Sequence, residues 1–155
     1  MKRVILPLMA ALVAMLAVAA VAGGHGSPGH RSLELVATEV SFNFVDVDPK
    51  QTDPESASPG DSFLIHEDIT KHGKPFGKSY IQCTFITTDA AQCLATLDTS
   101  KGQITVHGTF VGDTPEFTFA VTGGTGDYTG ASGTIRIQNG EEENSPTLYT
   151  IHLLR

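Results

Sequence analysis

The sequence predicts a single all-β domain in which eight short antiparallel strands close into a barrel, preceded by a signal peptide. Three observations support this fold class. Segments rich in Val, Thr, Ile and Phe alternate between apolar and polar residues. In one of them the apolar residues at every second position are Phe117, Phe119 and Val121. Glycine is abundant, with 16 residues, which is typical of tight turns. No stretch of about ten residues combines the helical spacing of apolar residues with helix-capping residues at its ends.

The first 22 residues are predicted to be a signal peptide. Lys2 and Arg3 form a short positive region, an uncharged apolar run extends from Val4 to Val21, and Ala20-Val21-Ala22 matches the small-x-small cleavage pattern. An uncleaved transmembrane anchor is the alternative, because the run approaches the length of about 18 residues at which a spanning helix competes. In both cases the rest of the chain crosses a membrane, and we expect the mature protein to be secreted.

Cleavage after Ala22 leaves residues 23–32 as a flexible leader and residues 33–155 as the barrel domain. Loss of Lys2 and Arg3 reduces the 10 basic residues to eight against 17 acidic residues, so the formal net charge of the mature chain is −9. A surface this negative repels phosphate backbones and anionic lipid headgroups. We therefore expect neither nucleic acid nor, after signal cleavage, a membrane as a partner.

The predicted strands follow one another along the mature chain. They are Leu33–Asp46, Ser62–Thr70, Ser79–Ile86, Gln92–Asp98, Gln103–Phe110, Glu116–Thr122, Gly133–Gln138 and Thr147–Leu154. The first should be bent or bulged, because its apolar face changes phase after Ala37. Closure into an up-and-down barrel removes exposed sheet edges, and a two-sheet sandwich is the alternative. An eight-stranded barrel can either be filled by side chains or hold one small ligand.

Cys83 and Cys93 are the two cysteines, and in an exported chain two cysteines usually pair. A turn at residues 87–89 would place them directly opposite each other on one face of a hairpin. The sequence therefore predicts a cross-strand disulfide. A reactive thiol is the alternative, but it needs an electropositive surrounding that the neighbouring residues do not supply.

The segment Phe119–Ile135 has the sequence FAVTGGTGDYTGASGTI, in which a strand runs into a glycine-rich turn and out into the next strand. This segment is similar to the signature of the allene oxide cyclase-like and dirigent-like β-barrel proteins. The resemblance covers the chain from Leu33 to its end and looks most like the secreted bacterial branch. It implies a barrel that binds a small hydrophobic molecule and guides its cyclisation, isomerisation or coupling, as an isomerase, cyclase or dirigent protein does.

The glycine-rich turn does not match a nucleotide-binding loop, because it lacks the third glycine, the following helix and a P-loop lysine. Its glycines supply positive φ and close backbone approach at a barrel corner; they are Gly123, Gly124, Gly126 and Gly130. Tyr128 can cover this corner. The histidines also lack the spacing of a structural metal site. We expect no cofactor and no metal.

Candidate site residues are polar side chains on predicted apolar faces. Glu67 shares a face with Phe63 and Ile65. A carboxylate on that face would be desolvated, which favours its protonated form and suits a general acid. The alternative is that this face points outward and that Glu67 is exposed beside Asp68. Tyr80 is the second candidate catalytic residue.

Three further residues are candidate ligand contacts, namely Gln82, Tyr128 and Tyr149. Gln82 shares a face with Tyr80, and this face is either a ligand surface or an exposed or oligomer-facing row. Tyr149 lies on the face of Ile151, and tyrosine hydroxyls are common donors in cavities. These residues leave open whether the chain is an enzyme. The alternative is a non-catalytic secreted binding or structural barrel with a filled interior, acting through its surface as a dimer or trimer.

Overall fold

The computed structural model describes residues 31–47, 57–112, 114–140 and 145–154. The predicted signal peptide and residues 23–30 of the predicted leader lie outside the described residues. The elements are β1 (Arg31–Val45), β2 (Ser62–Lys71), β3 (Lys74–Phe85), β4 (Ala90–Thr99), β5 (Gly102–Val111), β6 (Glu116–Gly124), the short 3-10 helix η2 (Gly126–Tyr128), β7 (Ser132–Gln138) and β8 (Thr147–Leu154). In this part of the chain no helix is long and apolar enough to cross a membrane.

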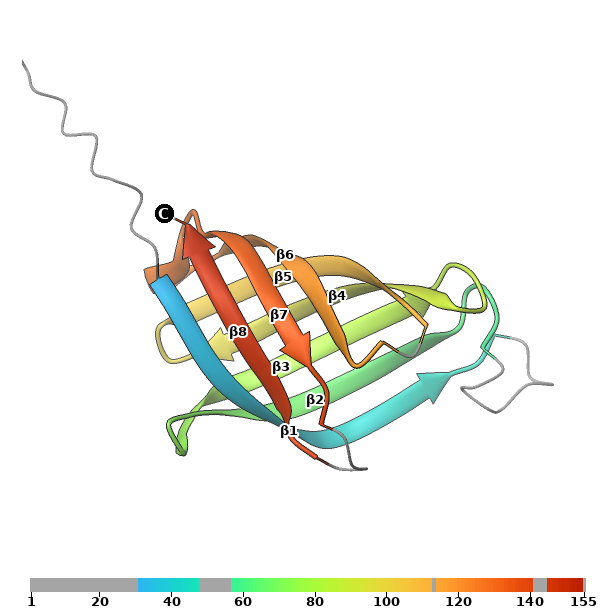
Figure 1. Cartoon of the computed structure of the whole chain (residues 1–155), viewed down its shortest axis with the longest axis horizontal. Coiled ribbons are helices and arrows are strands. Elements are labelled where there is room, and N and C mark those ends of the chain that lie inside the picture. The colour runs from blue at the N-terminus through green and yellow to red at the C-terminus, as the bar shows by residue number, and fades with distance from the viewer. Residues whose placement is uncertain (1–30, 48–56, 113, 141–144, 155) are drawn as a thin grey trace, which may run out of the picture.

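The strands lie around a closed antiparallel barrel in chain order (Figure 1). Closure is made by β8, which pairs with β1 so that Ile151 lies opposite Leu33. This pairing confirms the predicted barrel over the alternative sandwich. It also makes Arg31 and Ser32 part of β1, because they pair with β8, although the sequence placed them in the leader.

β3 begins at Lys74 rather than at the predicted Ser79. A two-residue turn joins β2 directly to β3, with positive φ at His72 and Gly73. Such turns match the right-handed twist of the two flanking strands, so pairing resumes at once with Lys71 opposite Lys74. The third strand is therefore longer at its start than the sequence predicts.

The predicted irregularity in the first strand is confirmed as a bulge. The β1–β2 register shifts between Glu39 and Ser41, so that Val40 is an extra residue in β1. The first residues of β1 pair with β8, Val36 and Ala37 pair with both β8 and β2, and beyond Ala37 the strand pairs with β2 alone. A bulge bends its strand and increases the local twist, which turns the second half of β1 away from β8.

One end of the barrel is filled. Its side chains are almost completely buried and include Leu33, Leu35, Ile104, Tyr128, Ile151 and Leu153. Tyr128 is brought there by η2, whose first residue Gly126 has φ of 58°. A Cβ at this position would lie 2.4 Å from the carbonyl oxygen of Lys101, so the corner requires glycine.

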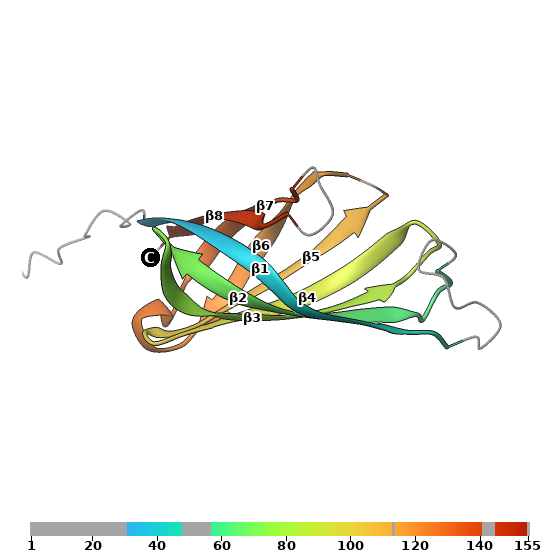
Figure 2. The ribbon, with the colours of Figure 1, turned by 90° about the horizontal axis from the view of Figure 1, so that it is seen from below.

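The other end of the barrel is open between two pairs of strands. β5 and β6 pair only where Ile104–His107 faces residues 120–124, and the remaining halves of these strands are not joined. Together with the separation of β1 from β8, this lets the strands spread apart at the end away from the marked C-terminus (Figure 2). The described part of the barrel is thus filled at one end and splayed at the other.

The disulfide is present where the sequence predicts it. Cys83 on β3 lies directly opposite Cys93 on β4, with 4.0 Å between their Cα atoms. Both residues are buried on the inner face of the barrel. The bridge therefore joins two neighbouring strands of the wall from the inside.

Candidate functional site

The splayed end of the barrel encloses a cavity of about 940 Å³. Its lining includes Gly112, Thr114 and Pro115 between β5 and β6, and residues on both sides of the β7–β8 connection. This volume lies near the upper end of the range of about 300–1,000 Å³ that is typical of ligand pockets. The interior is therefore hollow, in contrast to the filled interior that the sequence left as the alternative.

Aromatic rings form a large part of the cavity wall. They belong to Phe42, Phe63, Phe110, Phe117 and Phe119. The ring centroids of Phe117 and Phe119 are 5.1 Å apart, and those of Phe63 and Phe110 are 6.3 Å apart, so neighbouring rings support one another. Phe119 packs over Gly108, where an added Cβ would lie 2.1 Å from the ring. The phenylalanines line the cavity and do not fill it.

A buried hydrogen-bonded cluster interrupts this apolar wall. The hydroxyl of Tyr149 donates to Oε2 of Glu67 at 2.6 Å, and the hydroxyl of Ser79 donates to the same oxygen. All three side chains line the cavity, and Glu67 is only 5% exposed. Within the described part of the chain no hydrogen bond ends on Oε1 of Glu67. That oxygen is therefore available to a molecule in the cavity.

The strand register explains why these three residues meet. Glu67 on β2 lies directly opposite Ser79 on β3. Tyr149 lies on β8, two strands away from β2, and its partner on the intervening strand is Leu35. Because the wall curves around the barrel, the long tyrosine side chain reaches past β1 to the carboxylate. Glu67 and Tyr149 thus both lie on the inner face of the barrel, as their positions among apolar residues indicate, and the fold brings the two residues together.

Burial and the neighbouring carboxylate keep the Tyr149 hydroxyl protonated. Burial is the largest cause that raises the pKa of Tyr149 well above its ordinary value, and the negative charge of Glu67 and the hydrogen bond to it raise this pKa further. The neighbouring Ser79 hydroxyl lowers the pKa of Tyr149 and offsets part of this shift. Tyr149 is therefore a hydrogen-bond donor at physiological pH. The cluster therefore fixes the position of the Glu67 carboxyl group at the cavity wall.

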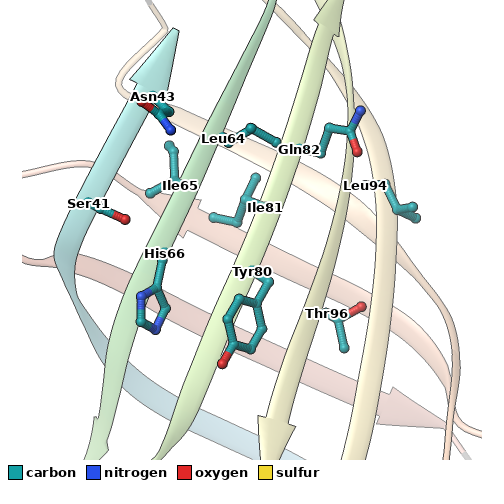
Figure 3. A pocket seen from close by; sticks show the side chains of 10 residues that line it. All are labelled: Ser41, Asn43, Leu64, Ile65, His66, Tyr80, Ile81, Gln82, Leu94 and Thr96. Carbon is teal, nitrogen blue, oxygen red and sulfur yellow. The ribbon is translucent and has the colours of Figure 1, made fainter. Parts of the chain in front are cut away.

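Tyr80 and Gln82 lie on the outer face of the barrel. This is the exposed row that the sequence left as the alternative to a ligand surface. Tyr80 is 48% exposed, and its ring is stacked on that of His66 at 5.0 Å between centroids. Both residues border an open groove of about 350 Å³ over β1–β4, beside Leu94 (Figure 3). They contact neither Glu67 nor the interior cavity, because successive residues of a strand point to opposite faces.

Tyr128 also lies apart from the cavity. Its side chain is 0% exposed at the filled end of the barrel, and the guanidinium of Arg31 lies 5.4 Å from its ring centroid. It does cover the glycine-rich corner, as the sequence predicts. The structure makes it a core residue and does not bring it to the site at which a ligand contact was expected.

Ser79 and Glu39 are polar residues of the cavity wall that the sequence did not identify as candidates. Ser79 has the same phase as Ile81 and Cys83, so their shared apolar face could have identified it. Glu39 follows Leu35 and Ala37 at intervals of two residues, but the change of phase that marks the bulge concealed it. Glu39 lies directly opposite Glu67 and lines the cavity.

Comparisons with known proteins agree with this architecture. The family model described as the allene oxide cyclase barrel like domain matches residues 43–148. A search of curated proteins finds no match. Among solved structures, the chain is similar to a pyocyanin demethylase with 20% identity and a TM-score of 0.69, over 79% of this chain and 99% of that one.

Two further solved structures have the same fold. A pterocarpan synthase dirigent protein has 17% identity and a TM-score of 0.68, over 82% of this chain and 85% of that one. A Diels-Alderase from Streptomyces koyangensis has 15% identity and a TM-score of 0.62, over 84% of this chain and 70% of that one. At these identities the likeness concerns the fold alone. Because the family model spans more than half of the sequence, the chain belongs to the family of allene oxide cyclase-like barrel proteins.

Proposed function

We propose that this protein binds a small, mainly apolar molecule in the interior cavity and guides its cyclisation, isomerisation or coupling. The observation that carries the proposal is the position of Glu67 in a cavity of about 940 Å³ with phenylalanine-rich walls. A largely apolar cavity favours burial of an apolar molecule, and the fixed polar group orients it. The solved structures with this fold include a Diels-Alderase and a dirigent protein, which is consistent with such a role.

Positioning is the main contribution of the protein in this mechanism. The aromatic wall selects a folded conformation of a flexible substrate, so that the reacting atoms are close before the bond forms. Oε1 of Glu67 accepts a proton from the substrate when the carboxylate is ionised, or donates one when it is protonated. Tyr149 and Ser79 hold the other oxygen, Oε2, so that the direction of this transfer is constant.

Export is part of the proposal. The charged start of the chain, the apolar run and the Ala20-Val21-Ala22 pattern support a cleaved signal peptide and a secreted product. Amino-terminal sequencing of protein from the culture medium tests this, with Gly23 expected as the first residue. A dimer or trimer stays a prediction from the sequence, and sedimentation velocity would measure it.

Identification of a bound small molecule is the first test of the proposed function. The protein is purified from culture medium without detergent, extracted with organic solvent and compared with a mock preparation by mass spectrometry. A candidate ligand is then added back, and the melting temperature and any product are measured. We expect an increase in melting temperature and a product formed by isomerisation, cyclisation or coupling of the ligand.

Matched variants decide where the ligand binds and whether it reacts. Ala95→Phe adds a ring to the inner wall, whereas Ala120→Phe adds the same ring on the exposed outer face. We expect only Ala95→Phe to abolish binding, and Glu67→Gln to retain binding but lose turnover. Binding without turnover in the unaltered protein would support a non-catalytic binding barrel instead. Equal binding by Ala95→Phe would contradict the cavity as the site.

A further inference from the structure

The cavity wall carries two carboxylates on neighbouring strands. Ala37 lies opposite Ile69, and both are buried on the inner face. Two residues further along β1, just before the bulge, Glu39 lies opposite Glu67 on the same face. Directly opposed residues in an antiparallel pair have Cβ atoms about 5 Å apart. Both glutamates line the cavity.

The two carboxylates differ in their surroundings. Glu67 is buried, and its Oε2 accepts the hydrogen bonds from Tyr149 and Ser79. Glu39 is exposed at the edge of the cavity, and no described residue forms an ion pair or hydrogen bond with its side chain. The cavity therefore has one carboxyl group buried in its wall and a second at its entrance.

The described part of the cavity lining offers no positive charge to compensate these two groups. Among the described residues that line it, none is lysine, arginine or histidine. The ion pairs found in the described part of the chain, Lys78–Asp68 and Arg136–Glu116, join exposed side chains elsewhere. Carboxylates beside low-dielectric walls produce a negative potential that is screened less than at an open surface.

We propose that the cavity selects uncharged or cationic molecules and rejects anions. This inference rests on the proposed function and names the ligand class of the same site. An amine, alcohol, phenol or amide can donate a hydrogen bond to Oε1 of Glu67, and a protonated amine also gains from the charge of Glu39. A carboxylate or sulfonate of equal size would approach two acidic groups without a compensating cation, which is unfavourable.

A series of competitors that differ only in charge tests the inference. The neutral fluorescent reporter N-phenyl-1-naphthylamine is bound to the purified protein near pH 7 at fixed ionic strength. It is then displaced by decylammonium, decan-1-ol or decanoate, with the two ions below their micelle concentrations and the alcohol below its solubility limit. We expect decylammonium and decan-1-ol to displace the reporter at concentrations at least about tenfold lower than decanoate does.

Variants at the two glutamates assign this preference to the cavity. We expect Glu39→Gln and Glu67→Gln each to strengthen displacement by decanoate several-fold. Glu34→Gln makes the same change in charge on the outer face of the same strand and should leave the preference unaltered, because Glu34 lies between the inward residues Leu33 and Leu35. Glu39 is exposed, so Glu39→Gln provides a test even if Glu67→Gln does not fold.

The outcomes separate this inference from the function on which it rests. If the reporter does not bind, or if Ala95→Phe binds it as well as the unaltered protein does, the cavity site and the selectivity are both refuted. If the reporter binds in the cavity but decanoate competes as strongly as decan-1-ol, only the proposed selectivity is refuted. If Glu34→Gln changes the preference as much as the cavity variants do, the preference arises from the overall negative charge of the protein. This result would also refute the inference.

Discussion

The hydroxyl of Tyr149 donates a 2.6 Å hydrogen bond to the carboxylate of Glu67, although the two residues are 82 positions apart and lie on strands that are not neighbours. β1 separates β8 from β2, so the bond spans a strand of the curved wall. It can form only when β8 has paired with β1 and the barrel has closed. The central group of the proposed site therefore depends directly on closure of the fold.

Tyr149→Phe should destabilise the protein. It removes one of the two donors to Oε2 of Glu67 and leaves a buried carboxyl with only Ser79. Removing a partner from a buried hydrogen bond costs about 1–3 kcal/mol. We expect the free energy of unfolding, measured by urea denaturation near pH 7, to fall by this amount. Tyr80→Phe is the control, because its exposed ring should tolerate the same change within about 0.5 kcal/mol.

The raised pKa of Tyr149 predicts a loss of stability in alkali. In the unfolded chain the tyrosine loses its proton near pH 10, whereas the folded protein retains this proton to higher pH. The folded state then binds more protons, so the free energy of unfolding should decrease as pH rises above about 10. Denaturation between pH 8 and pH 11 measures this, and the difference between the unaltered protein and Tyr149→Phe isolates the contribution. Parallel curves would contradict it.

The disulfide should contribute stability without being required for the cavity. Cys83 and Cys93 are 10 positions apart, and closing a loop of this length stabilises a protein by about 2–3 kcal/mol. We expect the double variant Cys83→Ala, Cys93→Ala to lose this amount in urea denaturation and to retain binding of the neutral reporter. Dithiothreitol should destabilise the unaltered protein and leave the double variant unchanged. Loss of reporter binding in a folded double variant would show that the bridge shapes the cavity.

Asp61 should stabilise the protein in a way that is lost in acid. It is 0% exposed and accepts hydrogen bonds from the backbone N–H of Val47 at 2.8 Å and of Ser58 at 2.7 Å, which join the end of β1 to the start of β2. The bond from Ser58, followed by that from Val47, lowers the pKa of Asp61. Its folded pKa is below the unfolded one, so this contribution is present above about pH 4 and disappears as pH falls through the folded pKa.

Asp61→Asn tests this role by acid titration. We expect the variant to unfold at a lower urea concentration at pH 7 and to lose less stability than the unaltered protein when the pH is lowered to 3. The exposed Asp68, which pairs with Lys78, provides the matched control Asp68→Asn, for which only a small change is expected. Equal effects of the two variants would refute a special role for Asp61.

Most of the fold could be predicted because its signals are local. Alternation of apolar and polar residues identified all eight strands, and the change of phase after Ala37 predicted that the first strand is bent or bulged, which the structure shows as a bulge at Val40. The spacing of Cys83 and Cys93 around a central turn predicted their register. The early start of β3 was not predicted, because Pro75 and Gly77 are residues that sequence patterns assign to turns.

The candidate site was only partly predictable. The inward position of Glu67 followed from its phase with Phe63 and Ile65, and that of Tyr149 from its phase with Ile151. The sequence left the face of Tyr80 and Gln82 open, and the inward phase of Ile81 and Cys83 places both residues outside. The bulge concealed the inward position of Glu39, so the pairing of two carboxylates could not be recognised from one strand alone.

By itself, the sequence determined the number and order of the strands and the hairpin disulfide, because these follow from backbone alternation and turn geometry over a few residues. The tertiary structure alone decided that one end of the barrel is filled around Tyr128 while the other encloses a cavity. It also decided that Tyr149 meets Glu67. Both outcomes depend on how far neighbouring strands pair and how strongly the closed wall curves, which no single segment contains.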